Sequence, residues 1–140
     1  MTLDAKWRNI LVAKNMDLFN KGAALILAKL YDEFPKPIHL NITHLDENMS
    51  DEEGEVYGAT LMFLRDEGFI RCGESLHRGL MTSNVVLSSK GLDILNSTPD
   101  ALKEKISLGE KIKEVAKNGT KEAISTVIQA VIGTVVANGI

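Results

Sequence analysis

The chain has 140 residues, of which 44% are hydrophobic and 25% charged, and its 16 basic and 19 acidic side chains give a formal net charge of −3. This size and composition fit one globular domain, alone or with an appended helical arm, and the acidic balance argues against nonspecific coating of nucleic acid. The single Cys72 excludes an intramolecular disulfide, and the first 30 residues lack a signal-peptide pattern, so we expect a cytoplasmic protein.

The amino-terminal region has apolar residues at helical spacing from about Ala5 to Phe34. Asn15 and Asp17 are good helix N-caps, which predicts a short leading helix followed by a longer one from about Asp17. Pro35 and Pro37 follow, and the residue before a proline avoids helical torsions. The second helix is therefore predicted to end just before them.

A short strand and a second helical region come next. Ile38, Leu40 and Ile42 alternate with polar residues, which predicts an extended segment with one buried face. Ser50 followed by Glu53 forms a capping-box pattern that starts a helix, and Gly68 is a natural stop for it.

The pattern then changes to the period of β-strands. Residues 69–74 and 83–88 read as two short strands, joined by a hairpin loop over residues 75–82 that contains Gly79. Ser88 or Ser89 is predicted to cap a further helix that reaches Asn96, before residues 97–99 break it.

The carboxy-terminal part differs in composition from the rest. Residues 101–122 read as a lysine-rich polar helix interrupted at residues 118–119, and residues 123–140 carry no charged side chain. Within the latter, four residues recur at 4-3-4 spacing, as in a helix that packs on another helix, namely Ile124, Ile128, Val131 and Val135. We expect this stripe to form a homodimer. Contact with a membrane through the same segment is an alternative.

The order of these elements resembles the winged-helix variant of the helix-turn-helix. The residues that carry the likeness are Leu61–Ile70, which resemble a recognition helix running into a wing, and Val85–Leu92, which resemble its return strand and the next cap. The resemblance covers about residues 17–96. It implies a mainly α fold of the α+β class, with a winged-helix domain over residues 1–98, a small β-hairpin wing, and a helical arm over residues 99–140.

The helix over residues 50–67 would be the recognition helix of such a domain, but its charge is wrong for DNA. Residues 46–67 contain one base, Arg65, and eight acids, namely Asp46, Glu47, Asp51, Glu52, Glu53, Glu55, Asp66 and Glu67. Acids in a first turn also favour the helix dipole, yet this number exceeds what capping needs. Many winged-helix domains bind DNA and a minority bind only proteins. We therefore predict a non-enzymatic regulator or adaptor whose acidic helix face binds a protein through Asp51, Glu52, Glu55 and Tyr57.

The alternative is a transcriptional regulator that binds DNA. Its contacts would come from the wing and the same helix, through Thr60, Arg65, Arg71, His77 and Arg78. Tyr57 and Thr60 are exposed only if Val56, Leu61 and Leu64 face the core of the domain. A continuous basic strip that joins Arg65, Arg71 and Arg78 would favour this alternative.

The sequence offers little for catalysis. His39 and His44 lie near Asp46 and Glu47, but two histidines in a turn-rich segment hold a metal poorly. Cys72 lies in a predicted strand and reads as a structural thiol. No phosphate-binding glycine loop is present, so we predict neither an enzyme nor a bound cofactor or metal.

Overall fold

A computed structural model describes residues 5–99 and 105–138, and its longest element is the helix α1 (Ala5–Glu33). The two helices predicted for this region are one continuous helix of 29 residues, so that prediction is wrong. Asn15 and Asp17 are suitable caps, but no glycine or proline breaks the chain before them, and an exposed polar side chain is tolerated within a helix. Pro35 and Pro37 follow the end of α1 as predicted.

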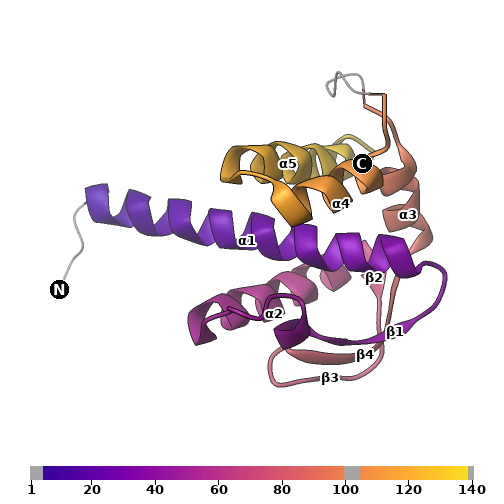
Figure 1. Cartoon of the computed structure of the whole chain (residues 1–140), viewed down its shortest axis with the longest axis horizontal. Helices are drawn as coiled ribbons and strands as arrows, with labels where there is room; N and C mark the ends of the chain where they lie inside the picture. The colour runs from indigo at the N-terminus through magenta and orange to yellow at the C-terminus, as the bar shows by residue number, and fades with distance from the viewer. Residues whose placement is uncertain (1–4, 100–104, 139–140) are drawn as a thin grey trace.

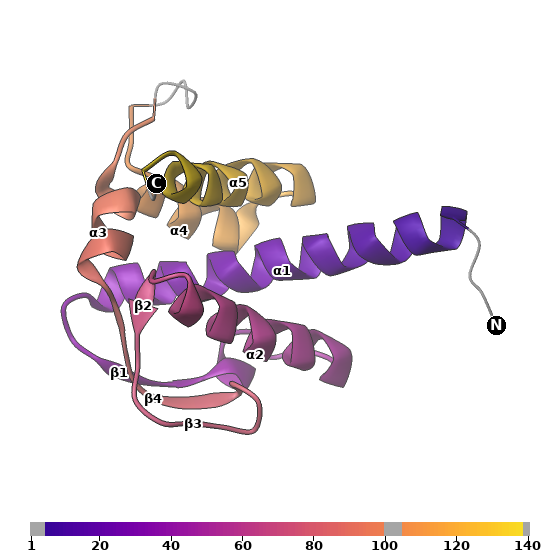
Figure 2. The same ribbon diagram turned by 180° about the vertical axis from the view of Figure 1, so that it is seen from behind.

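Helix α1 lies between two layers (Figures 1 and 2). On one side are α2 (Asp51–Asp66) and a small sheet, and on the other are α4 (Leu108–Asn118) and α5 (Lys121–Asn138). One hydrophobic cluster draws side chains from α1 and from both layers. The segment 99–140, predicted as an arm for packing or dimerisation, therefore packs on α1 where it is described. None of the described helices is both long and apolar enough to cross a lipid bilayer.

Small residues let α1 approach its neighbours closely. Ala23 and Ala24 are fully buried, and a Cβ atom at Gly22 would lie 2.6 Å from the Tyr57 ring on α2. On the other side, Gly109 of α4 lies against the Tyr31 ring, where a Cβ atom would approach ring carbons to 2.5 Å. The mixture of small residues with Ile26, Leu27 and Leu30 thus fixes both layers against one helix.

The sheet is antiparallel and built around β4 (Met81–Leu87). Its order is β1 (Ile38–Asn41), β4, β2 (Ile70–Arg71), and the short β3 (Ser75–Leu76) also pairs with β4. Ile42, predicted to continue the first strand, instead begins a short 3-10 helix, η1 (Ile42–His44). Asn41 ends the strand because its side-chain oxygen accepts a hydrogen bond from the Thr43 amide at 3.0 Å.

The hairpin loop is shorter than predicted. Ser75 and Leu76 pair with Thr82 and Met81, and the Ser75 and Thr82 hydroxyls lie 2.9 Å apart. His77, Arg78 and Gly79 then turn the chain with positive φ angles of 55°, 57° and 91°. This turn packs on α2, since a Cβ atom at Gly79 would lie 3.1 Å from the Gly58 Cα atom.

Helix α3 (Ser89–Asn96) starts at the predicted Ser88 cap. The Ser88 hydroxyl oxygen accepts a hydrogen bond from the Gly91 amide at 2.9 Å and donates to the Phe69 carbonyl at 3.0 Å. The cap therefore also ties α3 to the start of β2. Farther along, the Tyr31 hydroxyl donates to the Asn96 side chain at 2.8 Å, which joins α3 to α1.

Two glycine substitutions should have opposite effects on stability. Gly91 of α3 lies against the Phe69 carbonyl, so the methyl group of Gly91→Ala would collide with backbone and force α3 away from β2. We expect a loss of about 2 kcal/mol or more in the free energy of unfolding. Outside the adjoining residues and the nearby backbone of α5, Gly133 has no atom within 4 Å of its Cβ position, so Gly133→Ala should add about 0.5–1 kcal/mol through helix propensity.

Urea denaturation followed by circular dichroism measures both changes against the wild-type chain. Equal effects of the two substitutions would contradict the close packing of α3 on β2.

Candidate functional site

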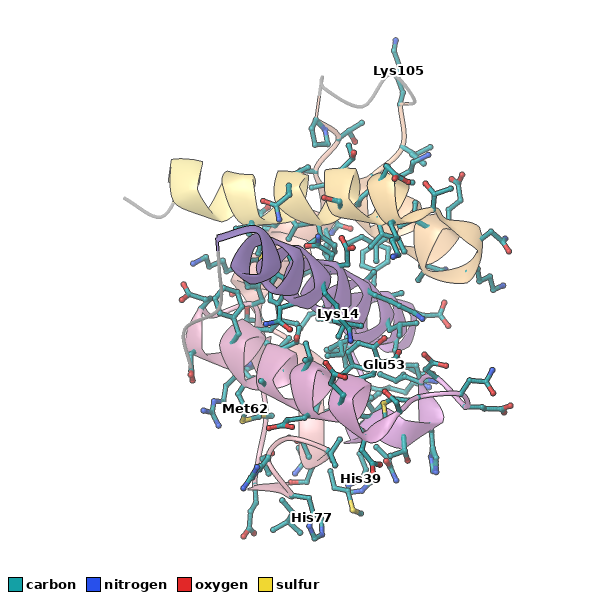
Figure 3. All side chains as sticks on the ribbon, turned by 90° about the vertical axis from the view of Figure 1, so that its left-hand side faces the viewer. Lys14, His39, Glu53, Met62, His77 and Lys105 are labelled. Carbon is teal, nitrogen blue, oxygen red and sulfur yellow. The ribbon has the colours of Figure 1, made fainter. Side chains whose placement is uncertain are left out.

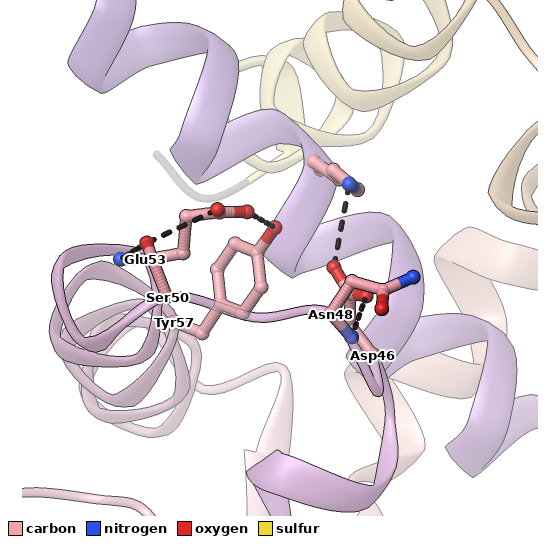
Figure 4. Close-up of polar contacts among 6 residues, drawn as sticks. Asp46, Asn48, Ser50, Glu53 and Tyr57 are labelled. Atoms are coloured by element: carbon pink, nitrogen blue, oxygen red, sulfur yellow. Dashed lines mark hydrogen bonds and ion pairs between the residues drawn. The ribbon is translucent and has the colours of Figure 1, made fainter.

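The amino-terminal end of α2 is held by the predicted cap (Figure 4). The Ser50 hydroxyl oxygen accepts a hydrogen bond from the Glu53 amide at 3.2 Å and donates to the Glu53 carboxylate at 3.1 Å. The other carboxylate oxygen of Glu53 accepts a hydrogen bond from the Tyr57 hydroxyl at 3.4 Å. Ser50, Glu53 and Tyr57 therefore form one connected polar group at the border of the core.

Tyr57 is not available to a partner, which corrects its assignment as a binding residue. Its side chain is only 1% exposed and lies between α1 and α2. Burial raises the pKa of Tyr57 well above its ordinary value, and the negative charges of Glu53 and Asp46 raise the pKa further. Its function in this structure is to anchor α2 on α1.

An acidic cleft opens beside α2, between η1, the start of α2 and the β3–β4 turn. Its volume is about 410 Å³. Two apolar side chains, Met49 and Leu80, contribute to its lining, and its charged and titratable lining residues are Asp46, Glu47, Asp51, Glu55, His77 and Arg78. We call this feature the acidic cleft. It contains Asp51 and Glu55, two of the four residues predicted to bind a partner.

Bases from distant parts of the chain neutralise some of these acids. Lys21 of α1 lies 3.4 Å from Asp46, and Arg78 of the turn lies 3.9 Å from Glu55. Glu52, the remaining predicted partner-binding residue, lies beside the cleft and pairs with Lys14 at 3.3 Å. Figure 3 shows Lys14 and Glu53 on the facing sides of α1 and α2. The two exposed pairs, Glu55 with Arg78 and Glu52 with Lys14, contribute at most about 1 kcal/mol each, so a charged partner can compete for Glu52 and Glu55.

Four of the eight acids of residues 46–67 have no ion pair among the described residues, namely Glu47, Asp51, Glu53 and Glu67. Glu47 and Asp51 are exposed, and within the described part of the chain neither forms an ion pair. The negative field of the segment 46–67 is therefore smaller than the sequence count implies, and Glu47 and Asp51 keep part of it at the cleft.

The residues predicted for DNA binding are not brought together. Thr60 is 2% exposed and its hydroxyl donates to the Val56 carbonyl at 2.7 Å, so its assignment to DNA is wrong. Arg65 donates to the Asp66 carboxylate at 2.9 Å, and this hydrogen bond raises the pKa of Arg65. Arg71 is exposed on β2, while His77 and Arg78 are exposed in the turn.

Arg65 and Arg78 are not neighbours along α2. Arg78 lies beside Glu55, and Arg65 lies ten residues farther along α2, which is about 15 Å of helix. Between them the solvent side of α2 presents Ala59, Met62 and Phe63, and Figure 3 shows Met62 on that outer side. Arg65 and Arg78 are therefore not joined by basic side chains along α2.

The predicted dimerisation stripe is used within the chain. Ile128 and Val131 are fully buried and Ile124 is 9% exposed, and all three belong to the core shared with α1. The side chain of Val135 lies outside the described residues. These three side chains cannot form a dimer interface, because the contact between α5 and its own chain already covers them.

The histidines and the cysteine do not assemble into a site. Across the described ranges, no three side chains of His, Cys, Asp or Glu group as metal ligands would. His39 and His44 are both exposed. Cys72 is half-buried, and burial raises the pKa of its thiol, which disfavours the reactive thiolate.

The sequence interpretation missed an apolar groove on another side of α2. Phe63, an apolar residue of α2, is 38% exposed and packs edge-to-face on Phe19 of α1, with ring centroids 5.3 Å apart. Helical spacing indicates that Phe63 lies on a different side of α2 from the core residues. It is about 100° from Leu64 around the helix, toward Ala59 rather than Leu61.

The buried Tyr57 predicts a specific dependence of stability on pH. The raised pKa means that the folded chain keeps a proton that the unfolded chain releases above about pH 10. The contribution to stability is therefore complete below that pH and is lost as the pH rises further. We expect Tyr57→Phe to lose less stability than the wild type between neutral and strongly alkaline pH.

Thermal unfolding across this range measures the difference, and the absorbance of tyrosinate follows ionisation directly. Equal alkaline losses in the two proteins would show that Tyr57 ionises as a surface group does.

The chain was compared with known proteins, and the function has to be inferred from the geometry described above. No protein-family model, curated protein or solved structure matches the chain significantly.

Proposed function

We propose that the chain is a non-enzymatic, cytoplasmic regulator or adaptor of the winged-helix kind, which binds a basic protein segment in the acidic cleft beside α2. The observation that carries the proposal is the solvent side of α2, which is acidic at its start and apolar in its middle. A helix with this surface suits a protein partner better than a nucleic acid.

The element order supports the winged-helix interpretation. Helix α1 is followed by the extended β1, then by η1 and α2, and then by the strands around β4 and helix α3. In this interpretation η1 stands for the first helix of the helix-turn-helix, α2 for the recognition helix, and the β3–β4 hairpin for the wing. The wing turn packs on α2 at Gly58, so the two would act as one surface.

The composition of α2 supports a protein partner. Reading base edges requires Arg, Lys, Asn or Gln side chains that project from the helix. Helix α2 contains no Lys, Asn or Gln, and its one arginine, Arg65, is paired with Asp66. Asp51, Glu52 and Glu55, which are exposed on the same helix, would repel a phosphate backbone.

The cleft has the chemistry to bind a basic amphipathic segment. Glu47 and Asp51 offer carboxylates that have no ion pair among the described residues, and Glu55 can exchange its long contact with Arg78 for a closer one. Met49 and Leu80 offer apolar surface beside them. A partner with lysines or arginines around one or two apolar side chains would satisfy both features.

DNA binding through the wing is the second candidate. It is favoured by the exposed His77 and Arg78 at the tip of the turn, where the Arg78 side chain is 88% exposed, and by Arg71 on β2. These side chains could contact phosphates without reading bases. The two candidates differ in the sign of the partner's charge.

The charge of the cleft should decide binding of a basic probe. We use a fluorescent helical peptide of lysines and leucines and measure its anisotropy on titration with the chain. The double substitution Asp51→Lys with Glu55→Lys should weaken binding by roughly tenfold or more, because two attractive charges become repulsive. Asp93→Lys, an exposed acid on α3, is the control and should change the affinity by less than about twofold.

A labelled mixed-sequence duplex tests the second candidate in the same assay. Tight binding that falls steeply with salt, and that Arg78→Ala weakens, would replace the adaptor proposal by DNA binding. Equal peptide affinity for the double variant and the wild type would also overturn the proposal.

A further inference from the structure

An apolar groove lies between α1, α2 and α5, separate from the acidic cleft. Its volume is about 610 Å³, and its apolar lining comes from Met16, Phe19, Val56, Phe63 and Ile132. Met16 is 44% exposed and Phe63 is 38% exposed. Two large apolar side chains so close together on the surface are typical of an interaction site rather than of scattered surface residues.

The first turns of α1 leave the body beside this groove. Figures 1 and 2 show that α1 extends past the ends of α2 and α5 into solvent. Residues 5–13 of these turns have the sequence AKWRNILVA, in which six of nine residues are apolar. A helix with so many apolar residues is normally covered on more than one side.

The chain cannot fill its own groove with this segment. Helix α1 forms one wall of the groove and continues without a break from Ala5 to Glu33, so its first turns run away from the lining residues. Folding them back would require a break in the helix near Met16. Residues 5–13 and the apolar groove therefore belong to one chain, but residues 5–13 cannot reach the groove of that same chain.

We propose that the groove is filled by the first turns of α1 from a second copy of this chain. In a two-fold arrangement the two α1 helices run antiparallel, and each copy offers both its projecting turns and its groove, so the contact forms twice. A stable dimer buries about 800 Å² on each partner, and a repeated contact favours reaching that area. Val12 is one of the six apolar residues of the projecting turns.

Charge supports a second copy as the occupant. The projecting turns carry Lys6 and Arg8, and α1 has no acid between Ala5 and Met16. On the exposed side of α2 are the acids Glu52 and Asp66, which lie four residues before Val56 and three residues after Phe63, two residues that line the groove. A basic apolar helix therefore has acids along one border of its binding site, in a chain whose net charge is negative.

This dimer uses a surface different from the α5 stripe and leaves the acidic cleft open. Val56, Ala59 and Phe63 of α2 face the groove, whereas Asp51, Gly54 and Glu55 face the cleft. The acidic cleft therefore stays uncovered in the proposed dimer.

Sedimentation equilibrium of the full chain tests the dimer. We expect a mass of twice 15.3 kDa for the wild type. Met16→Glu, Phe63→Glu and Val12→Glu should each raise the Kd for dimerisation by roughly 100-fold, because each places a charge in an apolar contact. Leu76→Glu, which alters an exposed apolar side chain on β3 outside the groove, is the control and should remain dimeric.

Hydrogen exchange locates the contact. Amides of residues 5–13 should be protected in the wild type and lose that protection in Phe63→Glu, while the circular dichroism of that variant matches the wild type. A wild-type chain that is monomeric at the highest soluble concentration would overturn the proposal. So would a dimer that survives all three groove substitutions, or a monomer whose residues 5–13 gain protection only on vesicles of anionic lipid.

Discussion

The structure depends on the burial of one helix, α1, between two layers that both pack against it. The second half of α1 presents Ala23, Ala24 and Leu27 with no exposed surface, and both layers pack against it. Small residues at Gly22 and Gly109 bring aromatic rings into direct contact with backbone on the two sides. Because α2 and α5 are both positioned by α1, the acidic cleft and the apolar groove are consequences of where this helix runs.

The tertiary structure also redistributes charge. In the sequence, the acids of residues 46–67 stand almost alone, but folding brings Lys14 and Lys21 from α1 and Arg78 from the turn onto them. Of the acids left without an ion pair among the described residues, Glu47 and Asp51 line the cleft. A local field of this kind steers and orients a basic partner, whereas an even acidic surface would only repel nucleic acid.

Helix α2 contributes to two surfaces with different chemistry. Its cleft side is acidic and includes Asp51 and Glu55, and its groove side is apolar and includes Ala59 and Phe63. The function proposed for the cleft and the dimer proposed for the groove are therefore compatible, and a dimer would present two clefts. Two linked clefts raise the apparent affinity for a partner that carries two basic segments.

The sequence by itself determined the features that depend on a few neighbouring residues. These are the end of α1 before Pro35, the caps at Ser50 and Ser88, the stop at Gly68, and the helical state of residues 121–138. Each follows from local backbone torsions or from one nearby hydrogen bond, so no distant residue is needed to predict it.

Only the tertiary structure decided which face of each helix is buried. It joined two predicted helices into α1, buried Tyr57 and Thr60, turned Phe63 outward, and placed Ile128 against its own chain. An apolar residue at helical spacing shows that a helix has a face to cover, but the covering element comes from a distant part of the sequence. The surfaces on which the function depends are therefore set by long-range packing.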